Sequence, residues 1–199
     1  DQKGNLDPST YGSNDITDPN VVASVIKNVI LGLKSANANS KGAIANIPYV
    51  TSIPYFTAVP YNPVPLSSAS ASTLNTSFSA INAKLKSVGM AERFSTLTAS
   101  TSNPVLIIDK SLTDISAYLP AQYAIYGQAR HATANDLILL PASSVIGIDP
   151  TTGLPPTSTS TKINGVTIPL ADQLVLTEKE AAKVIAATDA YNASISSLA

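Results

Sequence analysis

Few side chains in this sequence are equipped for acid–base or nucleophilic chemistry. The chain has 199 residues, with one His, one Met and no Cys. Without Cys it has no disulfide, no thiolate metal ligand and no Cys nucleophile. A Ser–His hydrolase needs a His to carry the proton and a carboxylate to orient that His. The one His, His131, has Gln128 rather than a carboxylate three residues before it. A packed or surface His is the favoured interpretation, and proton transfer by His131 is the alternative.

Oxygen ligands near the N-terminus are the second candidate for chemistry. Asp1, Asn5, Asp7 and Asp15 offer carboxylate and amide oxygens to a hard cation. Their spacing fits no EF-hand loop, and no Glu closes the set. A single His also does not suffice for a His-based metal site. We therefore expect no metal and no cofactor.

The third candidate is an aromatic, proline-rich stretch over residues 49–65. Pro54, Pro60, Pro63 and Pro65 are expected to exclude a central strand or a helix there. The prolines limit the freedom of the loop, so aromatic rings on it are held in place at low entropic cost. We expect substrate-binding rings among Tyr55, Phe56 and Tyr61. The alternative is that these rings only pack on the protein's own sheet.

Helical and apolar patterns predict the elements that would position these residues. Apolar spacing and caps predict helices at 19–35, 73–88 and 178–197, and a shorter one at 111–118. Apolar runs without alternation predict buried strands at 43–47 and 104–108. A weaker strand signal lies at 166–168, and residues 137–140 are an apolar run that ends at Pro141. Residues 1–17 and 149–165 are expected to be loops. Helix, loop and buried strand in this order predict an α/β fold with a mostly parallel sheet, in a single domain (1–199) or a large part of one.

Composition excludes several classes of partner. Lys and Arg number 12, Asp and Glu 13, and the net charge is −1. No basic surface is therefore expected for nucleic acid. No apolar run reaches the roughly 18 residues that a membrane span needs. About a fifth of the chain is Ser or Thr, a neutral polar surface that favours a secreted or cell-surface protein.

Three segments resemble blocks of a known family. They are KGAIANIPYVTSIPYFTAVPYNPVP (41–65), GQARHATANDLILLPASSVIG (127–147) and NGVTIPLADQLVLTEKEAAKVIAATDAYN (164–192). In order and spacing they are similar to blocks of the SGNH/GDSL-type hydrolase lipoproteins of Bacteroidetes. The resemblance covers nearly the whole chain. It implies a three-layer, flavodoxin-like α/β fold. It also implies an extracytoplasmic localisation, at the outer-membrane surface or in the periplasm.

The resemblance also implies that the family's catalytic groups lie outside these residues. The family's nucleophilic Ser belongs to a G-[DN]-S-L block upstream, and its His to an Asp-x-x-His block downstream. Gly12–Asp15 match the family's G-x-N-D motif in form, which would make Asn14 an oxyanion-hole residue. That motif normally follows a buried strand, whereas here a loop precedes it, so a turn is favoured. Tyr49 and His131 also depart from the family, which commonly has Asp and Gln there.

Two functions are therefore open on the sequence. The first is a part of an ester hydrolase, lipase- or esterase-like, that supplies sheet, helices and cleft loops. Its partners would be a small-molecule, glycan or lipid ester and the remainder of the parent hydrolase. Because no catalytic Ser–His pair is recognisable, activity of this chain by itself is not expected. The alternative is a non-catalytic cell-surface module that binds through residues 49–65.

Overall fold

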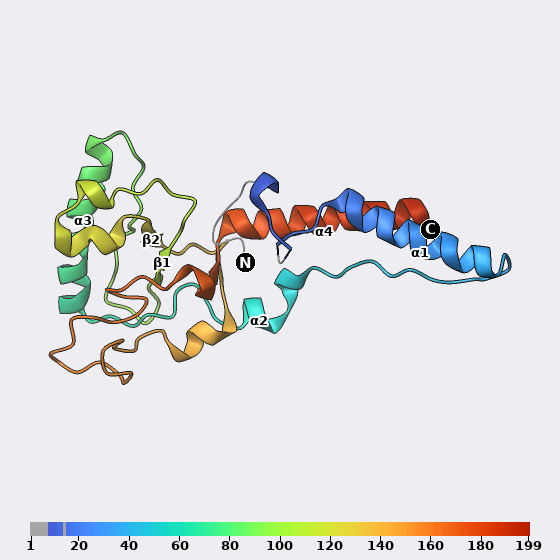
Figure 1. Cartoon of the computed structure of the whole chain (residues 1–199). Coiled ribbons are helices and arrows are strands. Elements are labelled where there is room, and N and C mark those ends of the chain that lie inside the picture. Colours follow the sequence, from blue (N-terminus) through green and yellow to red (C-terminus); the bar gives the residue numbers. More distant parts are fainter. Residues whose placement is uncertain (1–7, 14) are drawn as a thin grey trace.

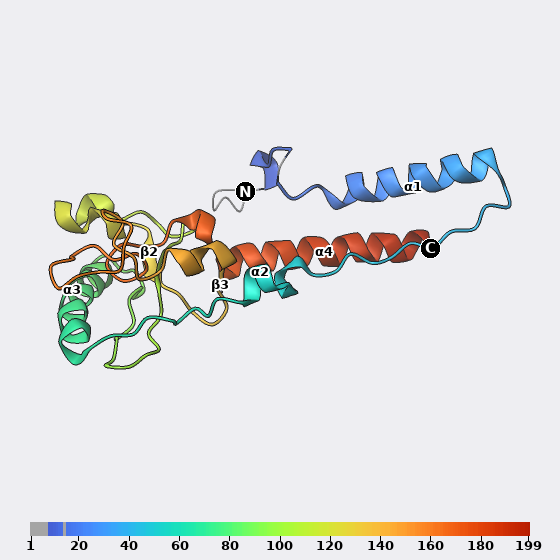
Figure 2. The same cartoon turned by 90° about the horizontal axis from the view of Figure 1, so that it is seen from below.

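Helices α1 (Pro19–Ala36) and α4 (Glu178–Leu198) run side by side away from a folded head (Figures 1 and 2). This computed structural model describes residues 8–13 and 15–199. From the end of α1, residues 37–53 return along α4 toward the head in both views. We call α1, α4 and residues 37–53 the arm, and residues 59–177 the head. The short helix α2 (Pro54–Thr57) lies between them. The expectation that the prolines exclude a helix here is wrong for this one turn, because Pro54 stands at its first position, where no N–H is needed.

The helices begin where their capping residues stand. Asp18 accepts the backbone N–H of Asn20 at 2.7 Å at the start of α1, directly before Pro19. Thr177 and Glu180 form a complete capping box at the start of α4. These two predicted helices are confirmed. Helix α3 (Ser68–Ser87) begins five residues earlier than predicted, because Ser67 caps it by accepting the N–H of Ser70.

The predicted parallel sheet is wrong. Strand β1 (Leu106–Ile108) pairs antiparallel with β2 (Ala129–His131), and β3 (Leu137–Ile138) pairs antiparallel with β4 (Val175–Leu176). In the described chain these two-stranded sheets are the only ones, so the three-layer flavodoxin-like α/β expectation fails. Parallel contact is limited to single bridges, such as the one between Ile107 and Leu170. The region 166–168 has no strand of its own, and only a 3-10 turn, Ser116–Tyr118, forms within 111–118.

The other predicted strand, 43–47, lies in the arm and is exposed along its length. Its apolar residues indicated burial between two layers, but no strand in the described chain comes alongside it. An apolar run shows that a segment favours burial and does not say what covers it.

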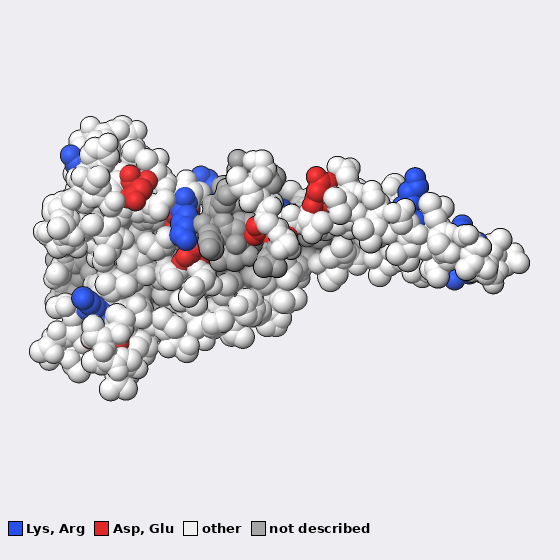
Figure 3. All heavy atoms as spheres, viewed as in Figure 1, with Lys and Arg blue, Asp and Glu red and all other residues white. Residues whose placement is uncertain are grey.

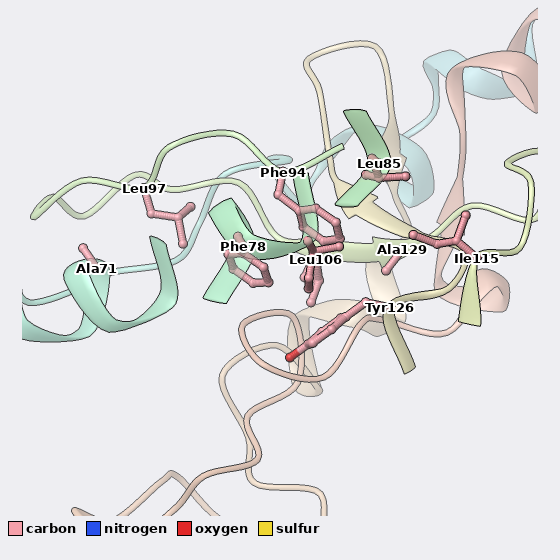
Figure 4. Packing of buried hydrophobic residues seen from close by; sticks show 10 residues of the cluster. Ala71, Phe78, Leu85, Phe94, Leu97, Leu106, Ile115, Tyr126 and Ala129 are labelled. Atoms are coloured by element: carbon pink, nitrogen blue, oxygen red, sulfur yellow. The ribbon is translucent and has the colours of Figure 1, made fainter. Parts of the chain in front are cut away.

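The head holds two clusters of buried side chains, one on each face of β1. Helix α3 packs one face, where Phe78, Ile81 and Leu85 meet Leu106 (Figure 4). Val105 and Ile107 point to the other cluster, with Ile138, Leu170 and Val175. Val105, Leu106 and Ile107 are each 0% exposed. The expectation that this apolar run is covered on both faces is confirmed for residues 105–107.

Among the described residues, no helix is both long enough and apolar enough to cross a membrane.

Candidate functional site

His131 is buried in the head beside Ser95. The ring Nδ1 accepts the backbone N–H of Ser95 at 3.0 Å and lies 2.9 Å from the Ser95 hydroxyl. An Nδ1 that accepts an N–H carries no proton, so the neutral ring is protonated on Nε2 and the hydroxyl also donates to Nδ1. Phe78 and Phe94, which stack on each other, both pack against the His131 ring in a T-shaped arrangement, with ring centroids 5.0 and 5.8 Å from it.

This Ser–His contact lacks what a catalytic pair needs. Burial lowers the pKa of His131 to about 4, which makes the ring a weak proton acceptor at neutral pH. In the described chain no carboxylate is hydrogen-bonded to it, whereas a hydrolase His is oriented by one. Neither Ser95 nor His131 lines any of the larger clefts of the described residues. The contact therefore holds residue 95 against β2 and creates no nucleophile.

The neighbouring Arg130 pairs with two buried carboxylates, and one of them, Asp136, also contacts the start of α4. Its guanidinium donates to both oxygens of Asp136 at 2.6 Å, and its Nε donates to Asp109 at 2.7 Å. Asp136 also accepts the backbone N–H of Glu178, the first residue of α4, at 2.9 Å. Burial favours a higher pKa for Asp136, but the hydrogen bonds from Arg130 and from the N–H of Thr133 hold that pKa below its ordinary value. The network fixes the direction in which α4 leaves the head.

Polar contacts from α4 hold the other two parts of the arm. The Asn192 side chain accepts the N–H of Ile47 at 2.7 Å and donates to the Ile47 carbonyl at 3.0 Å. The Tyr49 hydroxyl donates to Asp189, whose charge raises the pKa of Tyr49 together with that hydrogen bond. The Tyr191 hydroxyl donates to the carbonyl of Thr17 at 2.6 Å, just before α1. The α4 residues in these contacts all lie between 189 and 192, in the second half of α4.

Helix α1 presents more apolar surface than α4 covers. Val22, Ile26 and Ile30 are half-buried, and no residue of α1 is fully buried. Beside them, Val25 is 57% and Val29 56% exposed. A groove of about 900 Å³ opens toward the end of the arm. It is lined by α1, residues 40–44 and the end of α4, with Ile30, Leu33, Ile44 and Leu198 among its apolar side chains. Exposed apolar surface of this extent is typical of an interaction site.

The outer part of the arm is basic. Residues 21–50 contain Lys27, Lys34 and Lys41 and no Asp or Glu. Figure 3 shows Lys or Arg atoms, and no acidic atoms, at the free end of the arm on the face drawn. Lys34 and Lys41 both line the groove. Apolar and cationic groups therefore occur together at this end.

The three predicted binding aromatics do not share a cleft. Tyr55 and Phe56 lie on α2 at the base of the arm, with ring centroids 5.1 Å apart. Tyr61 packs on the second core cluster in the head. A cleft of about 830 Å³ in the head lies between residues 63–74 and 146–167 instead, and no ionisable side chain lines it. Ligand binding by the three rings stays a prediction.

The N-terminal candidates fall mostly outside the described residues. Asn14, Asp1, Asn5 and Asp7 are not described. Asp15 accepts the N–H of Gly12 at 2.7 Å, as in a turn. In the part of the chain that is described, no three His, Asp or Glu side chains gather as metal ligands do.

Sequence reasoning missed Ser95 and the Arg130 network because both depend on pairings distant in the sequence. It also missed the exposure of α1. The sequence does contain a signal for this exposure, which is the width of the apolar face of α1. Val21, Val25 and Val29 form a second apolar row beside Val22, Ile26 and Ile30.

Comparisons with protein-family models, with curated proteins and with solved structures gave no match.

Proposed function

We propose that this chain is the non-catalytic portion of an extracytoplasmic ester hydrolase of the SGNH/GDSL type, and that its arm docks on the portion that carries the catalytic groups. The observation that carries the docking role is the apolar, basic arm. The kind of hydrolase rests on the resemblance of residues 41–65, 127–147 and 164–192 to that family.

The head supports a non-catalytic role. Its only Ser–His contact has a buried His of low basicity and no orienting carboxylate. The cleft of about 830 Å³ in the head has neutral walls. The Ser and His of the reaction therefore have to come from the docked portion, as the resemblance implies.

The surface of the whole chain supports docking. It measures 11,424 Å², about 2,500 Å² more than expected for a compact protein of this mass. Each partner in a standard interface buries about 800 Å². The arm therefore has ample surface for a stable interface.

The experiment compares p-nitrophenyl acetate turnover by the 199-residue chain and by the full product of its gene. We expect no turnover above background for the chain and turnover for the full product. Turnover by the chain that is lost in His131→Ala or Ser95→Ala would contradict the non-catalytic assignment. A full product that is inactive on acetate, butyrate and longer acyl esters would reject the hydrolase.

A cell-surface binding module is the second candidate, and one observation favours it. Tyr49, Val50, Ile53 and Tyr55 are each between 41% and 44% exposed, a cluster suited to binding a polymer or a protein. An inactive full product that binds a glycan, with binding lost in Tyr55→Ala, would favour this function.

A further inference from the structure

Residues 42–46 of the returning segment have an open backbone edge. All of them are exposed, and none of them makes a hydrogen bond in the described chain. The next residue, Ile47, is held to α4 by Asn192 through both its N–H and its carbonyl. In Figures 1 and 2 no other part of the described chain lies on the side of this segment away from α4. An exposed row of unpaired N–H and C=O groups is a template for another strand.

The pairing groups of this edge are complementary to themselves. In a strand, alternate residues direct their N–H and C=O groups to the same side. Because those of Ile47 face α4, those of Gly42, Ile44 and Asn46 face the open side when the segment is a strand. A two-fold axis at Ile44 sets two copies antiparallel, with Ile44 opposite Ile44 and Gly42 opposite Asn46. Every open N–H and C=O group of the edge then has a partner in the other copy.

The side chains and charges of the segment permit this register. Gly42, Ala43 and Ala45 are small, so a second backbone can approach closely. The two Ile44 side chains lie on the same face of the pair and cover each other beside the apolar groove of each arm. The two Lys41 residues lie on opposite sides of the axis, about 20 Å apart. That separation exceeds the roughly 8 Å over which exposed charges act at physiological salt.

The size and shape of the molecule also permit a dimer. Its surface exceeds that of a compact protein of this mass by about 2,500 Å², whereas each copy buries about 800 Å² in a standard dimer. The two strands run in opposite directions, so the second head lies beyond the free end of the first arm and the two heads do not collide. The second copy approaches on the side away from α4, so Val25 and Val29 of α1 stay open for docking.

We propose that the chain forms a two-fold dimer in which residues 42–46 of two copies pair as antiparallel strands about Ile44. The dimer goes beyond the proposed function and does not rest on it. It uses the open edge of the returning segment, whereas the docking role uses the exposed face of α1.

A single introduced cysteine tests the register, because the chain has no Cys of its own. At the axis, the Cα atoms of the two residues 44 are about 5.5 Å apart, within the roughly 4.4–6.8 Å that a disulfide spans. Val50 is the matched control: it is 41% exposed and Ile44 is 39% exposed, but the two copies of residue 50 lie roughly 40 Å apart. Under mild oxidation we expect a covalent dimer of Ile44→Cys on a non-reducing gel, and no covalent dimer of Val50→Cys. Equal cross-linking of the two variants overturns the register.

Sedimentation equilibrium of the unchanged chain measures the dimer directly, at concentrations from about 1 μM to about 1 mM. Asn46→Pro removes an N–H of the open edge, and Asn46→Thr keeps it and favours a strand. We expect the dimer Kd to rise at least about tenfold with Pro and not to rise with Thr. An unchanged chain that is monomeric at every concentration overturns the proposal, and so does an equal Kd of the two variants.

Hydrogen exchange of single amides distinguishes strand pairing from any other contact between copies. In the paired strands the amides of Gly42, Ile44 and Asn46 are hydrogen-bonded, whereas those of Ala43 and Ala45 are not. Where the dimer predominates, we expect the first three to exchange about 100-fold more slowly than in the monomer, and the other two to be unchanged. A dimer without this alternation contradicts strand pairing. All three experiments use the 199-residue chain without substrate, so their failure leaves the proposed hydrolase untouched.

Discussion

At the scale of single residues, burial decides what the ionisable groups do. His131 is 5% exposed and neutral at pH 7, because burial lowers its pKa to about 4. The Arg130 side chain is 15% exposed, and Asp109 and Asp136 satisfy its charge and raise its pKa. The sequence offered His131 as a catalytic candidate because it is the only His. Its aromatic neighbours are Phe78 and Phe94, and no local pattern predicts them.

The pKa of His131 predicts how stability depends on pH. Because that pKa is lowered in the folded state from 6.5 to about 4, the unfolded chain binds more protons between these values. Stability is therefore full above pH 6.5 and falls as pH decreases toward 4. We expect the free energy of unfolding to decrease by about 2 kcal/mol from pH 7 to pH 5. Urea unfolding at pH 7 and pH 5 measures this decrease for the chain and for His131→Asn. The amide oxygen of that variant can accept the same N–H of Ser95 but does not titrate. If the variant shows the same pH dependence as the chain, His131 is not the source of the decrease.

The buried ion pairs predict a second residue-scale effect. Asp136→Asn leaves the charge of Arg130 only partly compensated, and the expected loss of stability is about 3 kcal/mol. The matched control is Asp172→Asn, which breaks the 2.6 Å pair with Lys110, where the side chains are 37% and 24% exposed. That change is expected to cost less than about 1 kcal/mol. Equal losses in the two variants would show that the Arg130 network does not anchor the fold.

At the scale of elements, local signals and long-range pairing differ in how far sequence predicts them. The three long helices follow from caps and apolar spacing, all read within one segment. The sheet does not, because 20 residues of chain lie between Ile108 of β1 and Ala129 of β2, and the pairing depends on turns and 3-10 segments of weak local preference. The same limit applies to the candidate site: the residues of the arm were predicted as a helix and a strand, but not as exposed.

The Asn192 contacts predict the behaviour of the returning segment. Asn192→Ala removes both hydrogen bonds to Ile47, and residues 40–49 then have Tyr49–Asp189 as their remaining polar contact with α4. We expect faster cleavage of this segment by a nonspecific protease, with the melting temperature of the head unchanged. The control is Ser197→Ala, since Ser197 bonds only to the carbonyl of Ser194 within α4. Unchanged cleavage would show that Asn192 does not hold the segment.

At the scale of the whole molecule, a head with two buried clusters carries an arm that buries little of its own apolar surface. The head has the covered strands and closed aromatic packing of a folded unit. The arm has apolar side chains and basic groups together on its outer part. Docking on a partner is therefore the role that we propose for it.

The most direct test of docking places a charge on the exposed face of α1. Val29→Asp changes a side chain that is 56% exposed, and Leu154→Asp changes one that is 63% exposed on the head. Both changes are expected to alter the free energy of unfolding of the 199-residue chain by less than about 0.5 kcal/mol. In the full gene product, kcat/KM for p-nitrophenyl acetate is measured for both. We expect Val29→Asp to reduce it at least about tenfold, because a carboxylate is buried against an apolar partner, and Leu154→Asp to leave it unchanged. Equal activity of the two variants would contradict the docking role of the arm.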